Sequence, residues 1–262
     1  VGSTKTRTPL LTSYYSGHTN ASKLYNGMIY PIRNLSVKGF IWDQGEENRN
    51  DNPLSNYGWL SYALINNWRE TFNQGTLPFY YVQMTPYSTD YFSTNPWGSS
   101  TKITFSLFRE VQGAIRAVPK TGMAVTADID DLLRLHPRNK KLIGERLAML
   151  ALQNDYKAPI NAVGPQFKNA VYNGGNKITL NFINADGLNS GGKPVNQWFY
   201  LANADKVFYK AVAVISGNTV VITIPSNMTN VKTIRYAFVD VAIGNIKNGA
   251  GLAMEPFRTD TW

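Results

Sequence analysis

The first half of the chain alternates short apolar runs with longer segments of helical periodicity. The runs 37–42, 77–84 and 122–127 have the length and composition of buried strands. Segments 57–72 and 103–118 instead repeat apolar residues at intervals of about four, as amphipathic helices do. This alternation predicts an α/β fold with a parallel sheet flanked by helices on both faces.

The helical segments carry distinct apolar faces. Leu60, Leu64, Trp68 and Phe72 share one face of the first long helix. A short helix over 24–32 is expected before the first strand. The same periodicity predicts a further helix after the 122–127 run, in which Ile143, Leu147 and Leu150 fall on one face.

After Tyr156 the pattern changes to runs in which apolar residues recur at every second position. The alternating apolar positions are Ile178, Leu180 and Phe182, then Val220, Ile222 and Ile224, then Ile234, Tyr236 and Phe238. Gly-Asn and Gly-Gly turns separate these runs, which predicts antiparallel strands. We therefore divide the chain into residues 1–158, an α/β domain, and residues 159–262, a β-sandwich-like C-terminal domain.

Composition narrows the function classes. The 262 residues carry a net charge of +9, from 26 Lys and Arg against 17 Asp and Glu. The basic residues are scattered and no nucleic-acid-binding motif accompanies them, so we expect no nucleic-acid partner. No run approaches the ~20 apolar residues of a membrane helix, so no membrane partner is expected. With no cysteines and two distant histidines, no metal or other cofactor is expected.

The candidate chemistry begins where the first apolar run ends. Residues 43–48, Asp-Gln-Gly-Glu-Glu-Asn, bring amide and carboxylate groups to the carboxyl end of that strand, where open α/β sheets bind their ligands. His136 lies on a loop just before a helical segment. A polar strand end and a loop histidine suggest acyl transfer. The chain has no G-x-S-x-G turn and no convincing nucleophile.

Two motifs carry a family resemblance. Residues 42–48 read W-x-Q-G-E-x-N, and residues 136–148 read H-P-x-N-K-x-x-x-G-x-R-L-A. Segments 24–29, 67–69 and 109–112 follow the same pattern in the same order. In these motifs the chain resembles the sialate O-acetylesterases, a branch of the SGNH hydrolases grouped with the carbohydrate esterases. The resemblance extends over most of the chain from residue 22 onward.

The resemblance implies a mechanism and a partner. In the family, a serine in a G-Q-S-N-like turn attacks the acetyl carbonyl, and the histidine of the H-P motif takes its proton. By motif match, His136 is the base. Gln44, Gly45 and Glu46, with Asn48 nearby, form the oxyanion and sugar-contact region. The implied partner is an O-acetylated carbohydrate, and the implied location is periplasmic or secreted.

Departures from the family pattern qualify this interpretation. The serine block is absent, and we expect it upstream of Val1, where the chain begins without Met as a processed product does. Leu133 stands where many members carry an acid three residues before the histidine. Asp128, Asp130 or Asp131 could orient His136 if the loop folds back.

Three hypotheses follow. The chain is the larger, C-terminal part of an O-acetylesterase, inactive alone; or a non-catalytic glycan-binding relative; or a fragment without an independent role. Without the serine strand, the sheet should be open, and an upstream fragment, a second copy or residues 1–20 should cover it. Rings that could stack on a sugar are those of Tyr87, Tyr91, Phe92 and Trp97 on a long loop.

Overall fold

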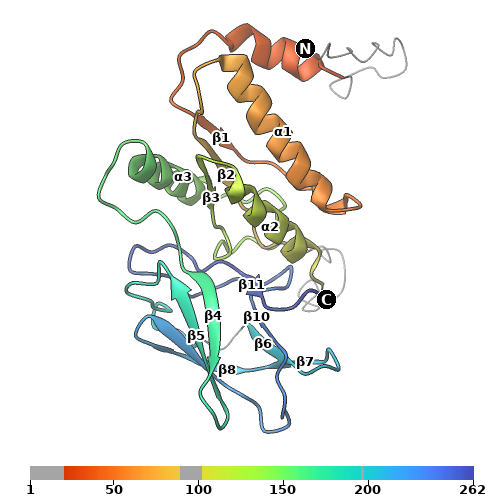
Figure 1. Ribbon diagram of the computed structural model, residues 1–262, viewed down its shortest axis with the longest axis vertical. Helices are drawn as coiled ribbons and strands as arrows, with labels where there is room; N and C mark the ends of the chain where they lie inside the picture. The colour runs from red at the N-terminus through yellow and green to blue at the C-terminus, as the bar shows by residue number, and fades with distance from the viewer. Residues whose placement is uncertain (1–20, 89–101, 196–197) are drawn as a thin grey trace, which may run out of the picture.

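The computed structural model describes residues 21–88, 102–195 and 198–262. Its first part contains a parallel sheet of three strands in the order β1-β2-β3 (Figure 1). These strands are β1 (Phe40–Trp42), β2 (Phe79–Val82) and β3 (Thr121–Ala124). The sheet and its helices, followed by antiparallel sheets, confirm the predicted fold class.

Helices cover both faces of this sheet. The long helices are α1 (Ser55–Phe72), α2 (Thr104–Ala114), which continues as η4 (Ile115–Ala117), and α3 (Lys140–Asn154). Short helices are η1 (Tyr25–Ile29), η2 (Tyr30–Ile32) and η3 (Glu47–Asn50). Phe79 and Tyr81 of β2 pack with α1 and α2, whereas Tyr80 and Val82 pack with α3 (Figure 1). This division follows from the two-residue period of a strand.

The buried face of α1 differs from the predicted one. Tyr57, Ile65 and Phe72 are buried, but Leu60 is 58% exposed. The predicted face is therefore wrong at its N-terminal end. The reason lies in the sheet, because β1 is an edge strand among the described residues and Leu60 lines an open groove with Trp42 of that strand.

The outer side of β1 is open in the part of the chain that the structure describes. β1 pairs with β2 and with no other described strand. Ile41 at its centre is 69% exposed, and Met28 and Leu35 in the preceding segment are also exposed. An apolar edge strand of this kind is a site for pairing with another strand.

The second part contains two antiparallel sheets. One has the order β4-β5-β9-β8 and the other the order β11-β10-β6-β7. The strands of the first sheet are β4 (Gln166–Tyr172), β5 (Lys177–Ile183), β9 (Thr219–Thr223) and β8 (Val212–Ser216). Those of the second are β11 (Phe257–Arg258), β10 (Thr233–Tyr236), β6 (Phe199–Ala202) and β7 (Phe208–Lys210).

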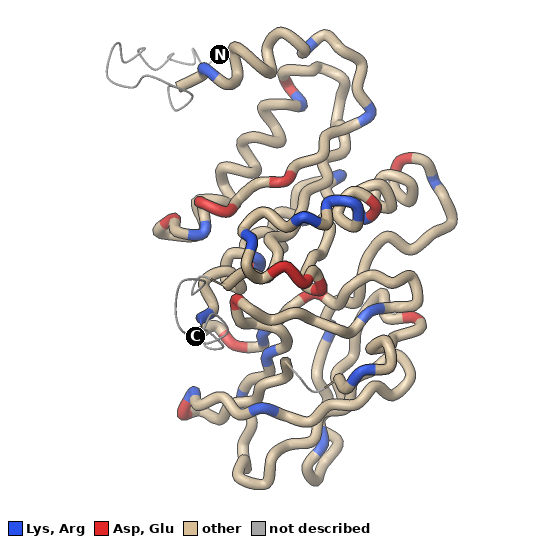
Figure 2. The backbone as a smooth tube through the Cα atoms, turned by 180° about the vertical axis from the view of Figure 1, so that it is seen from behind, with Lys and Arg blue, Asp and Glu red and all other residues tan. Residues whose placement is uncertain are grey.

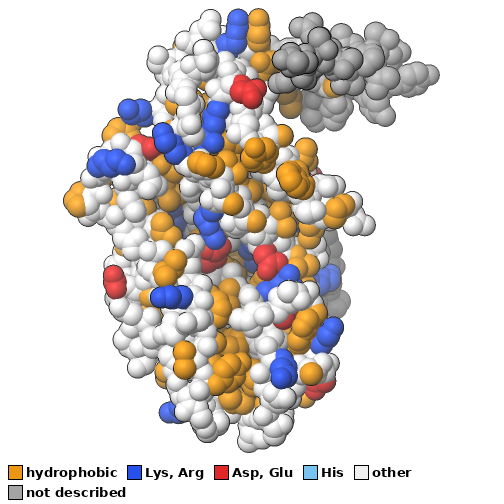
Figure 3. Space-filling model, viewed as in Figure 1, with side chains coloured by type: hydrophobic (Ala, Val, Ile, Leu, Met, Phe, Trp, Pro, Cys, Tyr) orange, Lys and Arg blue, Asp and Glu red, His pale blue; other side chains and the backbone are white. Residues whose placement is uncertain are grey.

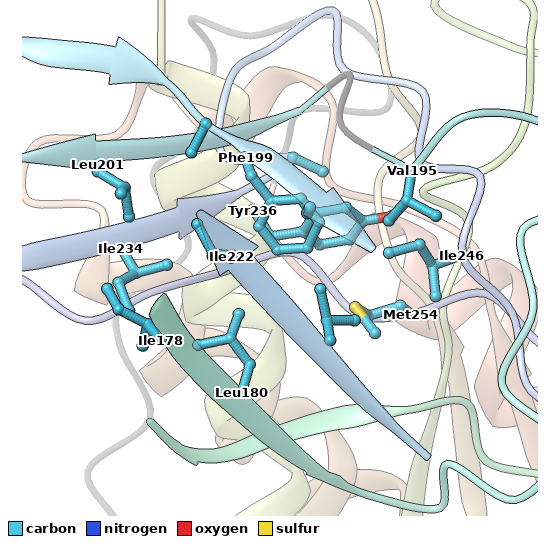
Figure 4. Packing of buried hydrophobic residues seen from close by; sticks show 14 of the residues in the cluster. Ile178, Leu180, Val195, Phe199, Leu201, Ile222, Ile234, Tyr236, Ile246 and Met254 are labelled. Atoms are coloured by element: carbon cyan, nitrogen blue, oxygen red, sulfur yellow. The ribbon is translucent and has the colours of Figure 1, made fainter. Parts of the chain in front are cut away.

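The two antiparallel sheets share one hydrophobic core. Ile178, Leu180 and Ile222 come from the first sheet, and their side chains meet Phe199 and Tyr236 from the second (Figure 4). All five are at most 1% exposed. In β5 and β9 the alternation seen in the sequence is that of core-facing and more exposed positions, whereas all four residues of β10 are buried and Phe238 lies beyond its end.

Polar groups join the two parts. The Asp240 carboxylate of the β part accepts hydrogen bonds from the backbone N–H groups of Phe105 (2.8 Å) and Ser106 (3.4 Å), which caps α2. Arg109 of α2 is 2% exposed and donates to the carbonyls of Met84 (2.9 Å) and Asp240 (3.1 Å). Burial lowers the pKa of Arg109 to about 10, although the Asp240 charge opposes this shift. Burial raises the pKa of Asp240, against the Arg109 charge and the helix N–H donors.

Candidate active site

The loop after β1 is held in one conformation by α1 and α2. Gly45 has a φ of +145°, and a Cβ atom there would lie 2.8 Å from the Phe108 ring. The Tyr57 hydroxyl of α1 donates to the Gln44 carbonyl at 2.9 Å. The glycine of the Q-G-E motif is therefore required by both backbone angle and space.

We expect Gly45→Ala to destabilise the protein by about 2 kcal/mol or more, since it combines backbone strain with overpacking. Urea unfolding measures the difference. Gly75→Ala is the matched control, because Gly75 also has a positive φ (+77°) but no atom within 4 Å of an added Cβ. Equal losses in the two variants would show that the Phe108 contact contributes nothing.

The amides of this loop form a hydrogen-bonded chain. The Gln44 Nε2 donates to Asn48 Oδ1 at 2.8 Å, and Asn48 Nδ2 donates to Asp51 Oδ2 at 3.0 Å. This chain fixes the Gln44 amide, which keeps a second N–H for a ligand. Two of the predicted contact residues, Gln44 and Asn48, thus lie together.

His136 lies beside this loop. Its Nε2 is 3.8 Å from Glu46 Oε1, with the histidine side chain 74% exposed and the glutamate side chain 22% exposed. A second contact fixes the same approach: Lys140 Nζ at the start of α3 lies 2.9 Å from Asp43 Oδ2. The structure therefore brings together the two sequence motifs at the carboxyl edge of the sheet.

Two of the three aspartates considered as partners of His136 contact other residues instead, and the third is exposed. Asp128 forms a bidentate pair with Arg146 at 2.6 and 2.7 Å and lies 2.7 Å from Lys247 Nζ. Asp131 accepts from the Arg138 N–H at 3.0 Å, and Asp130 is exposed. Acidic and basic residues lie close together in this region (Figure 2). Among the described residues, Glu46 is the carboxylate within 4.0 Å of His136.

Gln83 is a site residue that sequence reasoning did not select. It follows β2 directly, is 1% exposed, and its Oε1 has no hydrogen-bond partner. It lines a small cavity with Glu46, Leu135 and Pro137. The available signal was a polar residue near the carboxyl end of the predicted run 77–84, because such a residue lies at the same sheet edge as Gln44.

Arg69, in the family-like segment 67–69, and Tyr87, on the long aromatic loop, both make contacts within the protein. Arg69 donates to the carbonyls of Leu77 (2.9 Å) and Pro119 (2.7 Å). Tyr87 packs against Phe105 with ring centroids 5.5 Å apart. The other three aromatic residues of its loop, Tyr91, Phe92 and Trp97, lie outside the described residues.

Within residues 21–88, 102–195 and 198–262, no group of three or more His, Asp or Glu residues could hold a metal ion. No helix in those ranges combines the length and apolarity needed to cross a bilayer.

Comparison with known proteins places the chain among the carbohydrate esterases. Residues 9–153 match the family described as sialic acid-specific acetylesterases, and the chain belongs to this family. Rat and human sialate O-acetylesterases are each 34% identical to it over 148 residues. That stretch is 50% of this chain but 26% of the rat protein and 27% of the human protein, so the chain matches only about a quarter of their length.

A solved structure is similar over more of the chain. The crystal structure of a carbohydrate acetylesterase from Xanthomonas citri superimposes with a TM-score of 0.78 at 35% sequence identity. The similarity covers 91% of this chain and 54% of the Xanthomonas chain. The similar region therefore includes the antiparallel β part as well as residues within the 9–153 family match.

Proposed function

We propose that this chain forms the histidine and oxyanion side of a sialate-type carbohydrate O-acetylesterase. The nucleophilic serine would come from a segment outside residues 1–262. The observation that carries the proposal is the approach of His136 to Glu46 beside the Gln44–Gly45 turn. Family membership supports ester hydrolysis as the reaction class.

In the proposed reaction, His136 takes the serine hydroxyl proton as the serine oxygen attacks the acetyl carbonyl carbon. The sugar C–O–acyl linkage then breaks at the acyl carbon, and His136 returns the proton to the sugar oxygen. Water, activated by the same imidazole, releases acetate and regenerates the serine. Glu46 stabilises the imidazolium, and the free N–H of Gln44 faces the developing oxyanion. The distance of 3.8 Å between His136 Nε2 and Glu46 Oε1 shortens to that of a hydrogen bond in the complex with serine segment and substrate.

A groove beside β1 supports a separate source for the serine. It has a volume of about 240 Å³, and its lining residues include the apolar Trp42, Leu60 and Leu64 and the polar Gln44 and Asn48. A strand laid along the open edge of β1 would satisfy its backbone groups and cover this apolar surface. The carboxyl end of such a strand would reach Gln44, where a serine is needed.

The test is complementation with p-nitrophenyl acetate as substrate. We expect the chain alone to show hydrolysis close to background, because no serine lines the cavity beside His136 among the described residues. Addition of the source protein's segment with a G-Q-S-N-like turn should give turnover that a serine-directed organophosphate abolishes. Organophosphate-sensitive turnover by the chain alone would instead place the nucleophile within residues 1–262.

The alternative is a non-catalytic relative that binds acetylated glycans. The observation that favours it is the strong exposure of His136, 74%, in a site that holds no serine among its described lining residues. Binding of O-acetylated sialic acid without turnover, with the serine segment present, would select this alternative and reject the enzyme.

A further inference from the structure

A second cleft lies between α2 and the β part. Its volume is about 380 Å³, and its walls include Glu110 and Gly113 of α2, Gln166 of β4, and Phe257 and Arg258 of β11. It has no lining residue in common with the cavity beside His136 or with the groove beside β1. Ligand pockets in proteins begin at about 300 Å³, so this cleft is large enough for a small ligand.

Two ion pairs form the polar walls of the cleft. Arg258 binds Glu110 through two contacts, at 3.0 and 2.7 Å, and Arg116 binds Glu255 at 2.9 Å. Gln166 Nε2 adds a hydrogen bond to Glu255 at 2.9 Å. Two cations thus balance two anions, and each group is held in place by its partner. The Glu110 and Arg116 side chains remain 46% and 33% exposed, so they are accessible to a ligand.

Aromatic rings form the apolar walls. Phe167 and Phe257 stack with ring centroids 4.3 Å apart and an interplanar angle of 12°. Phe238 lies behind Arg258, whose guanidinium carbon is 5.2 Å from the ring centroid. Figure 3 shows acidic and basic side chains together across the middle of the molecule, between the helices above and the strands below.

We propose that this cleft binds a neutral pyranose ring of a glycan. Sugar hydroxyls both donate and accept, which matches walls that alternate carboxylate acceptors with guanidinium donors. The balanced charge disfavours an anion such as sialic acid itself. The C–H face of a pyranose suits the phenyl rings. Because the ion pairs are already formed, little side-chain ordering opposes binding.

Saturation-transfer NMR with the intact chain tests this inference. The probes are the methyl β-pyranosides of galactose, glucose and xylose, with N-acetylneuraminic acid as the anionic comparison. Gly113→Leu should block the cleft, since even a Cβ there would lie 3.2 Å from Glu255 Oε1. Gly144→Leu on α3 is the matched control, because a Cβ at Gly144 meets nothing within 4 Å. Glu110→Gln removes one charged acceptor while preserving the shape.

We expect the unmodified protein to bind at least one neutral pyranoside. The Gly144→Leu variant should bind it equally well, and the Gly113→Leu variant should give no saturation-transfer signal. Glu110→Gln should weaken binding about tenfold, the loss expected for one charge-assisted hydrogen bond. No transfer to any of the three neutral probes would overturn the inference. So would pyranoside binding that persists in both Gly113→Leu and Glu110→Gln. N-acetylneuraminic acid binding that is stronger than pyranoside binding and is lost in Gly113→Leu would also overturn it, because that loss places the anion in this cleft and not beside Gln44. These outcomes do not depend on ester hydrolysis and leave the proposed function to its own test.

Discussion

Replacing His136 with alanine should lower kcat by about a thousandfold or more once the serine segment is supplied. The variant lacks the group that takes the serine proton and returns it to the sugar oxygen. Its fold should be unaffected, because the imidazole is 74% exposed and its near contact is the 3.8 Å approach to Glu46. Initial rates with p-nitrophenyl acetate, together with a thermal unfolding curve, measure the two effects separately.

Arg138→Ala is the control for this experiment. Arg138 lies two residues away on the same loop and is exposed. Its backbone N–H donates to the Asp131 carboxylate, and alanine keeps this N–H. We expect this variant to retain the rate of the unmodified protein. An unchanged rate in His136→Ala would reject His136 as the base, and an equal loss in both variants would indicate damage to the loop.

Replacing Asp128 with alanine should destabilise the protein by about 3–5 kcal/mol, the usual cost of leaving a buried charge without its partner. The Arg146 side chain is 3% exposed and that of Asp128 is 2% exposed. Arg146 would keep the Val125 carbonyl at 2.6 Å but lose both carboxylate contacts. Urea unfolding measures the loss, and Asp130→Ala, at an exposed position two residues away, should change stability by no more than about 0.5 kcal/mol.

The ion pair of Asp128 and Arg146 also predicts how the stability of the protein depends on pH. Burial disfavours the Asp128 carboxylate, but Arg146 and Lys247 outweigh this effect and hold its pKa below the ordinary value of 3.8. A lowered folded-state pKa contributes stability above the unfolded pKa, and this contribution is lost as the pH falls through the folded pKa. The stability difference between the unmodified protein and Asp128→Asn should therefore be constant near neutral pH and narrow below about pH 4. A difference that grows on acidification would contradict the assignment.

Sequence periodicity predicted the positions of the strands and helices better than it predicted which of their faces are buried. The strands at 40–42 and 79–82 fall inside the predicted apolar runs, and the strand at 121–124 begins one residue before its run. Short apolar runs indicate strands even where one side chain stays exposed, as Ile41 does in β1. The face of α1 was not predictable in the same way. Leu60 satisfies the helical period, yet it lies over the open edge of β1 and is exposed. Periodicity does not reveal where a sheet ends.

The site shows a similar limit. The positions of Gln44 and His136 at one sheet edge follow from strand polarity and loop order, which are visible in the sequence. The contacts of Asp128 could not be predicted in this way, because one of its partners, Lys247, belongs to the β part. The proximity of Glu46 to His136 likewise depends on the path of the 128–139 loop, which no local pattern specifies.

The capping of α2 by Asp240 has a consequence for folding during synthesis. Residues 104–114 leave the ribosome long before residue 240 does. Until then, the N–H groups of Phe105 and Ser106 lack the Asp240 carboxylate that accepts their hydrogen bonds in the folded protein. Arg109 likewise lacks the Asp240 carbonyl during that interval. The helix that supports Gly45 through Phe108 therefore becomes fully fixed only when the β part is almost complete. A chain released before Asp240 would therefore carry every residue of the candidate active site but would lack the cap on the helix that packs against Gly45.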